Sequence, residues 1–260
     1  MTRWAGDLLV LCYHAVSPTW DADLSVTPQA LEWQLSRLVR RGYRGATFAD
    51  ATHSGEPRGR TLVVTFDDAF ESVHRLARPI LARLGIPATV FVPTHQALRD
   101  EPMSWPGVDQ WLDGPHAGEL HGMSSEQLRE LAADGWELGA HTRTHACLPD
   151  LPDEQLEAEL SGSKEDVERE LGVSCRTAAY PYGAADDRVC TAARAAGFEA
   201  AAGLSSDLRR ASRFYWPRVG IYHEDGRRRF GLKISRAVRL ARSRQTLAGL
   251  LRRTPIEEVT

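Results

Sequence analysis

The chain has 260 residues, of which 42% are hydrophobic and 26% charged, and its net charge is −3. It is therefore long enough to bury a substantial core, as one large α/β domain or as two small ones. Charges of both signs are balanced, and no basic run interrupts roughly the first two hundred residues. The composition therefore favours no nucleic-acid partner.

The cysteines and the N-terminus bear on the compartment in which the protein works. The cysteines include no C-x-x-C pair, which is typical of reduced thiols packed as small hydrophobes in a cytosolic protein. The first apolar run, residues 8–13, is too short for a signal or a membrane span and predicts a strand. If Met1 is the native start, we expect a cytoplasmic protein without a cleaved signal. The cysteines are Cys12, Cys147, Cys175 and Cys190.

Short apolar strands alternate with helical patterns along the rest of the chain. This alternation predicts a parallel sheet, open or closed into a barrel, with its chemistry at the carboxyl ends of the strands. A long irregular stretch, residues 93–123, is typical of a segment that lines or covers a site. The predicted helices are residues 28–42, 70–84, 126–134, 152–171 and 186–196, and the predicted strands are residues 8–13, 61–66, 88–92, 136–140, 176–180, 198–202 and 217–222.

Two adjacent carboxylates, Asp67 and Asp68, follow the predicted strand at residues 61–66. The backbone changes direction at a strand end, so both side chains can face the same mouth instead of alternating across the sheet. One can then bind a metal while the other accepts a proton. The alternative interpretation is that the pair caps the helix that begins near Phe70.

Two histidines, His141 and His145, follow the predicted strand at residues 136–140. Their four-residue spacing suits a metal if the segment coils into a helical turn, and Thr142 could bond within that turn and orient a ligand. Alone, the pair is typical of solvated loop histidines. Together with Asp68, the two histidines predict a catalytic divalent cation with one open position, which indicates hydrolysis.

Three further groups lie near predicted strand ends. Residues 180–183, Tyr-Pro-Tyr-Gly, predict a rigid turn in which the Tyr182 amide could face an oxyanion, although a plain turn explains them equally well. His14 and His223 each follow a predicted strand. The remaining histidines are expected to be ordinary surface or loop residues: His53, His74, His95, His116 and His121.

With these motifs in their order, the chain resembles the polysaccharide deacetylases of carbohydrate esterase family 4, relatives of the nodulation-factor deacetylase. The resemblance covers roughly residues 8–225 and rests on Leu-Cys-Tyr-His, Thr-Phe-Asp-Asp, His-Thr-Arg-Thr-His, Tyr-Pro-Tyr-Gly and Trp-Pro-Arg strings. It implies a distorted (β/α)7-type barrel and hydrolysis of N-acetyl, sometimes O-acetyl, groups on a carbohydrate. It also implies that Asp67 is the base, that the Tyr182 amide belongs to an oxyanion hole, and that a divalent metal, most simply zinc, is held by Asp68, His141 and His145.

The sequence departs from the family pattern at two points. Many members tether the base with an arginine where this chain has Ala179; Arg176 lies too early, whereas Arg218 could reach in from another strand. The late motif that supplies the general acid is imitated imperfectly by His223. Because the most similar subgroup opens with a Tyr-His pair, the resemblance favours His14 as the acid.

The composition changes near the C-terminus. We expect a barrel domain at residues 1–225 and a basic helical extension at residues 226–260, rich in arginine. The extension could lie on an anionic membrane, as a peripheral contact at the inner face, or pack on the barrel with its arginines solvated. Two rival functions remain: a deformylase or amidase acting on a lipid-linked modified sugar, and a catalytically silent glycan-binding barrel.

Overall fold

A computed structural model describes residues 7–53, 59–99, 101–204 and 211–243. Its main sheet is parallel and has the strand order β1-β10-β9-β8-β7-β6-β5-β4, with a further pairing of β1 with β5. The short strands β2 (Ala15–Val16) and β3 (Ser25–Val26) pair separately. The strands of the main sheet are β1 (Asp7–Tyr13), β4 (Arg44–Ala46), β5 (Arg60–Phe66), β6 (Ala88–Val92), β7 (Glu137–Ala140), β8 (Thr177–Ala179), β9 (Ala200–Leu204) and β10 (Trp216–Gly220).

The sheet closes into a barrel because strand β5 also pairs with β1. One edge of β5 pairs with β1 along its whole length, from Arg60 to Phe66. The other edge is divided, because β4 pairs with residues 61–63 and β6 with residues 64–66. Within the described chain, strands β1 and β5 to β10 therefore form a closed ring of seven, and β4 lies outside it. This arrangement confirms the predicted (β/α)7-type barrel.

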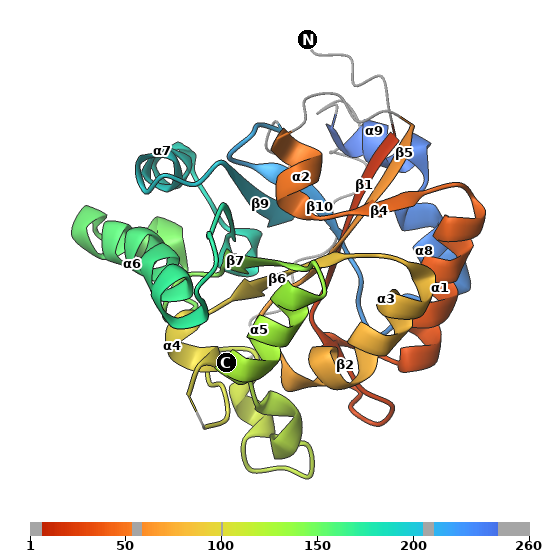
Figure 1. Ribbon diagram of the computed structural model, residues 1–260, viewed down its shortest axis with the longest axis horizontal. Coiled ribbons are helices and arrows are strands. Elements are labelled where there is room, and N and C mark those ends of the chain that lie inside the picture. The colour runs from red at the N-terminus through yellow and green to blue at the C-terminus, as the bar shows by residue number, and fades with distance from the viewer. Residues whose placement is uncertain (1–6, 54–58, 100, 205–210, 244–260) are drawn as a thin grey trace.

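Helices surround the barrel (Figure 1). The helix caps agree with the sequence: Thr27 accepts the Ala30 N–H, and Ser124 forms a capping box with Gln127. The helices are α1 (Pro28–Arg40), α2 (Phe48–His53), α3 (Arg78–Leu84), α4 (Thr94–Ala97), α5 (Ser125–Ala133), α6 (Asp153–Leu171), α7 (Asp187–Ala195), α8 (Arg227–Lys233) and α9 (Arg236–Ser243).

The predicted helix over residues 70–84 is confirmed, since the chain is helical from residue 71 to residue 84. Asp68 and Ala69, with left-handed φ angles of 70° and 55°, turn the chain just before it. Its first part includes a π-helical turn, Val73–Ala77, which leads into α3. Residues 93–123 are less irregular than expected, because they include α4 and the two 3₁₀ turns Asp109–Trp111 and Ala117–Leu120.

The barrel interior has its own small core, distinct from the larger core between barrel and helices. Small side chains line part of it, among them Ala179, Ala200 and Ala202. They leave room for the fully buried Arg218, whose guanidinium lies 5.3 Å from the centre of the Phe91 ring. Phe48 and Ala51 of α2 belong to this core, so α2 covers one end of the barrel.

The described part of the C-terminal extension packs on the barrel. Phe230 of α8 is fully buried, and Arg239 of α9 donates to the Leu8 carbonyl at 2.8 Å. Residues 244–260 lie outside the described chain. No helix in the part that the structure describes is long and apolar enough to cross a membrane. The domain boundary at residue 225, the membrane contact and the cellular location stay predictions.

Candidate active site

The sequence-predicted residues of the site gather at the carboxyl ends of the barrel strands. Asp67 and Asp68 follow β5, His141 follows β7 and His14 follows β1. Because β1 pairs in register with β5, with Tyr13 opposite Phe66, the residues that follow these strands meet at one mouth. Arg218 reaches the same region from within β10.

Asp68, His141 and His145 form one compact group of potential metal ligands. Each offers a donor atom that lies within 4.8 Å of the others, and all three residues are buried. Asp68 Oδ1 lies 3.4 Å from His141 Nε2 and 3.3 Å from His145 Nε2. Among the described residues this buried oxygen has no hydrogen-bond partner. A buried, unsatisfied carboxylate oxygen facing two imidazoles fits a bound divalent cation.

The other ring nitrogen of each histidine has a partner. His141 Nδ1 lies 2.8 Å from the Ala179 carbonyl, which can only accept, so His141 donates through Nδ1 and keeps Nε2 for a metal. His145 Nδ1 lies 3.3 Å from the Tyr182 hydroxyl. Trp105 stacks on the His145 ring at 4.3 Å between centroids. Both imidazoles are thus oriented with Nε2 toward Asp68.

The His141–His145 segment is a strained turn and not a helical one. Thr142 and His145 have left-handed φ angles of 65° and 62°, which are uncommon for residues other than glycine. The Thr142 hydroxyl accepts the His145 N–H at 3.0 Å. Sequence reasoning assigned Thr142 an orienting contact within this turn, and the structure contains one.

Asp67 is surrounded by donors. Arg218 donates to Asp67 Oδ1 at 2.6 Å and to Oδ2 at 2.8 Å, and the Cys12 thiol lies 3.4 Å from Oδ2. Burial by itself raises the pKa of Asp67, but the charge and hydrogen bonds of Arg218, together with the nearby histidines, outweigh it and lower the pKa to about 2. Asp67 is therefore an anion held in one orientation, 3.9 Å from His141 Nε2. Arg218 therefore tethers Asp67 as the family's arginine at the position of Ala179 would do.

Of the two candidate acids, only His14 lies at the carboxylates. His14 and Asp67 offer donor atoms within 4.8 Å of each other. Burial lowers the pKa of His14, although the charges of Asp68 and Asp67 act in the opposite direction. His223 is exposed, and its backbone N–H donates to the Asp23 carbonyl.

Tyr182 lies in the 3₁₀ turn Pro181–Gly183 with a left-handed φ of 59°. Its side chain remains 49% exposed while its hydroxyl contacts His145. The turn is tightly packed, because a Cβ atom on Gly183 would come within 2.8 Å of Leu204. This turn thereby places the Tyr182 side chain next to His145.

Sequence reasoning missed Cys12 and Trp105, which both touch the site. Cys12 lies on β1, two residues before His14, which follows the strand. Side chains two residues apart on an extended chain share a face, so this spacing could have identified Cys12. Trp105 lies in residues 93–123, where no periodic pattern predicts which side chains face inward.

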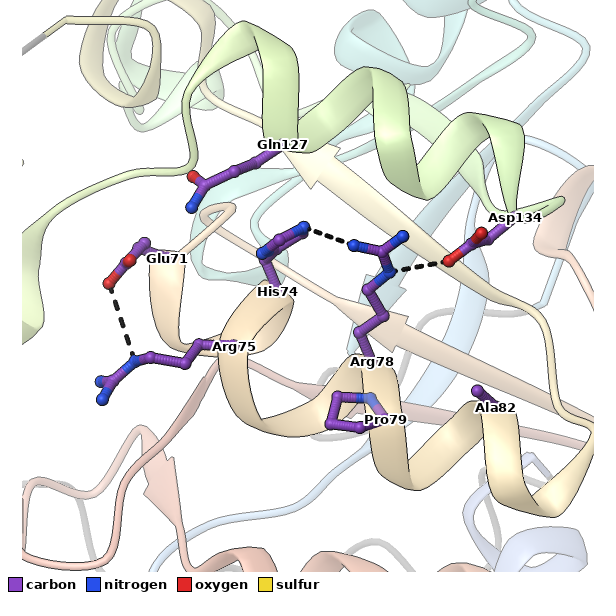
Figure 2. Close-up of a pocket in the computed structure, with 8 residues that line it drawn as sticks. All are labelled: Glu71, His74, Arg75, Arg78, Pro79, Ala82, Gln127 and Asp134. Carbon is purple, nitrogen blue, oxygen red and sulfur yellow. Dashed lines mark hydrogen bonds and ion pairs between the residues drawn. The ribbon is translucent and has the colours of Figure 1, made fainter.

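A shallow cavity of about 520 Å³ lies away from these residues, between α3 and α5 (Figure 2). Its charged side chains pair with one another: Arg78 with Asp134, and Arg75 with Glu71. The ligand group and Asp67 are not part of its lining, so this cavity is separate from the candidate active site.

Comparison with known proteins decides the family. Residues 54–201 match the family model described as polysaccharide deacetylase. The chain belongs to the polysaccharide deacetylase family. This result confirms the resemblance inferred from the sequence motifs.

Individual relatives of this polysaccharide deacetylase align with most of its length. YxkH of Bacillus subtilis is 25% identical over 216 residues, which are 82% of this chain and 69% of YxkH. The poly-beta-1,6-N-acetyl-D-glucosamine N-deacetylase of Staphylococcus aureus is 25% identical over 216 residues, covering 76% of this chain and 68% of that protein. The crystal structure of a polysaccharide deacetylase from Bacillus cereus superposes with a TM-score of 0.68 at 25% identity, over 88% of this chain and 69% of that one.

Proposed function

We propose that this polysaccharide deacetylase is a metal-dependent hydrolase that removes N-acetyl groups from an amino-sugar-containing glycan or glycolipid precursor. The observation that carries the proposal is the pair of adjacent carboxylates with different partners. Asp67 is held by Arg218, whereas Asp68 Oδ1 faces two imidazoles without a hydrogen bond among the described residues. The name of the Staphylococcus aureus relative supports the choice of an N-acetylated glycan as substrate.

Asp68, His141 and His145 would hold the metal. Two imidazoles and one carboxylate match the donor set of catalytic zinc sites, so zinc is the ion that we propose. When bound, the ion would polarise the acyl carbonyl and lower the pKa of a water molecule to about 7. The Nδ1 contacts of the histidines keep both Nε2 atoms available for it.

Asp67 would act as the general base. Arg218 keeps it ionised and oriented toward the ligand group, and thereby makes it a weaker base than a free carboxylate. A weaker base is sufficient if the metal lowers the pKa of the attacking water, because the difference in pKa between that water and Asp67 is then smaller. The gain from Arg218 is orientation, since both carboxylate oxygens are bound in one plane.

His14 would protonate the leaving amine. Burial lowers its pKa, so its imidazolium is a stronger acid than that of a solvated histidine. Its Nδ1 is buried and has no hydrogen-bond partner among the described residues. The Tyr182 amide would donate to the oxyanion of the tetrahedral intermediate. The products are acetate and a free amino sugar.

The proposal is tested by measuring acetate release from N-acetylglucosamine oligomers, β-1,4- and β-1,6-linked, together with elemental analysis of the purified protein. We expect about one divalent ion per chain and acetate release that stops after chelation and returns with zinc. Formate release from an N-formylated sugar, without acetate release, would favour the deformylase. Binding without any turnover would favour the silent barrel. The absence of an arginine at Ala179 is the one sequence feature that favours inactivity, and Arg218 supplies the missing partner of Asp67.

A further inference from the structure

The turn that carries His145 is held from outside by helix α6. Glu159 Oε2 accepts the backbone N–H groups of Arg143 at 2.7 Å and Thr144 at 3.0 Å. Its other oxygen, Oε1, accepts the Thr144 hydroxyl at 2.7 Å. Successive N–H groups that follow a left-handed residue, here Thr142, form a concave anion site. In this protein a carboxylate of the same chain fills that site.

A second contact joins the same turn to the same face of α6. The Arg143 guanidinium donates to Asp166 through Nε at 2.8 Å and Nη2 at 3.1 Å. Between the two acids lies Gly162, where a Cβ atom would come within 2.5 Å of the guanidinium. Glu159, Gly162 and Asp166 are spaced by three and four residues, so they form one stripe along the helix.

The opposite side of the turn is bound to the start of α4. The Thr94 N–H donates to the Thr142 carbonyl at 3.1 Å, and the His95 N–H donates to the Arg143 carbonyl at 2.8 Å. The turn is thus held between two helices. A backbone with two left-handed residues that are not glycine persists only when its surroundings fix it in several places, and Glu159 supplies three of the contacts.

We propose that Glu159 is a positioning residue for the metal ligand His145. The inference rests on the proposed metal-binding function. Glu159 touches neither His145 nor the other ligands; it fixes the backbone of Arg143 and Thr144, and hence the direction in which the next residue, His145, points. Without Glu159, the metal would have to order this turn as it binds, and the entropy of that ordering would weaken its affinity.

The test measures zinc affinity of the full chain by competition with a chromophoric chelator. We expect Glu159→Ala to weaken zinc binding by about 10- to 100-fold, the usual effect of losing a group that orients a ligand. Glu159→Gln can still accept both N–H groups and should restore affinity to within a few-fold of wild type. Glu157→Ala is the matched control, because Glu157 is an exposed glutamate on the same helix, and its affinity should be unchanged.

Each result decides between explanations. Unchanged affinity in folded Glu159→Ala would overturn the proposal, and so would equal losses in Glu159→Ala and Glu159→Gln, which would point to charge instead of position. If Glu159→Ala does not fold, the exposed Thr144→Ala decides: it removes one of the three contacts and should weaken binding less, and unchanged affinity would overturn the proposal. Wild-type protein that binds no zinc would instead refute the proposed function.

Discussion

At the scale of single residues, neighbouring identical side chains are given different properties by their surroundings. Asp67 accepts from Arg218 with both oxygens and from Cys12 with one. Asp68 Oδ1 faces the imidazoles of His141 and His145, and the left-handed φ of 70° at Asp68 turns the chain away from the direction of the strand. Burial by itself raises the pKa of Asp68, but the neighbouring imidazoles of His145 and His141 outweigh it and hold the pKa well below its usual value. The first carboxylate is suited to hold a proton briefly, and the second to hold a cation.

Replacement of the proposed base separates these roles. In Asp67→Asn we expect turnover to fall by at least about 100-fold, because general base catalysis is lost, while the zinc content stays near that of wild type. Stability should also fall, since Arg218 stays buried beside a neutral partner. Acetate release and elemental analysis are therefore measured well below the melting temperature. Asp68→Asn is the comparison, with loss of zinc; parallel loss of zinc in Asp67→Asn would mean that Asp67 is itself a ligand.

The candidate metal ligands could be predicted from the sequence, but the residues that hold them in place could not. Asp68, His141 and His145 could be grouped because each follows a recognisable strand, and strand ends meet in a parallel barrel. The contact of Glu159 with the turn at Arg143 could not be predicted, because a charged residue on an amphipathic helix looks the same whether it faces solvent or a backbone amide. Such pairings depend on how far α6 is rotated about its axis.

At the scale of elements, strong patterns were predicted well and weak ones were missed. The strand at residues 88–92 was predicted with the bounds that β6 has, because an apolar, β-branched run leaves little ambiguity. Strand β4 is only three residues long and contains Gly45, and α2 follows it directly. Neither has enough residues to form a periodic pattern, yet α2 closes one end of the barrel.

Strand β7 depends on a glycine that faces the barrel interior. A Cβ atom on Gly139 would come within 2.7 Å of the Phe91 ring and 2.9 Å of the Thr177 carbonyl. We expect Gly139→Ala to destabilise the fold by about 1–3 kcal/mol through overpacking, measured by urea unfolding. Gly118→Ala is the control, because a Cβ atom on Gly118 would have no neighbour within 4 Å in the described chain. Equal midpoints for the two variants would show that Phe91 can move aside at no cost.

At the scale of the whole molecule, the barrel buries the positive charge of Arg218 in its interior and pairs it there with the negative charge of Asp67. Arg218 is fully buried, and it satisfies its donors with Asp67, the Thr65 hydroxyl and the Gly203 carbonyl. Burying such an ion pair costs desolvation that the pairing only partly returns. The role proposed for Asp67 as the base would account for this arrangement, since apolar side chains of similar volume would avoid the desolvation.

Acid should destabilise the whole fold partly through Asp166. Burial raises the pKa of this carboxyl, but hydrogen bonds from Arg143 and Arg169 lower it to about 2. Because the folded pKa lies below the usual value of 3.8, Asp166 stabilises the fold above that value and loses this contribution as the pH falls toward 2. With allowance for solvent screening the contribution is about 1–2 kcal/mol, and a part of it should be gone at pH 3.

Asp166→Asn cannot titrate, so its urea midpoint should fall less than that of wild type between pH 5.5 and pH 3. Both proteins are compared without metal, in chelator, so that proton binding at the metal ligands contributes equally to each. The exposed Asp113 provides the control. The urea midpoint of Asp113→Asn should fall with pH as that of wild type does, because an exposed carboxylate contributes little to stability. If Asp166→Asn and wild type lose stability in parallel, the contacts of Asp166 do not distinguish its two protonation states, and the acid sensitivity of the barrel must originate in other carboxylates.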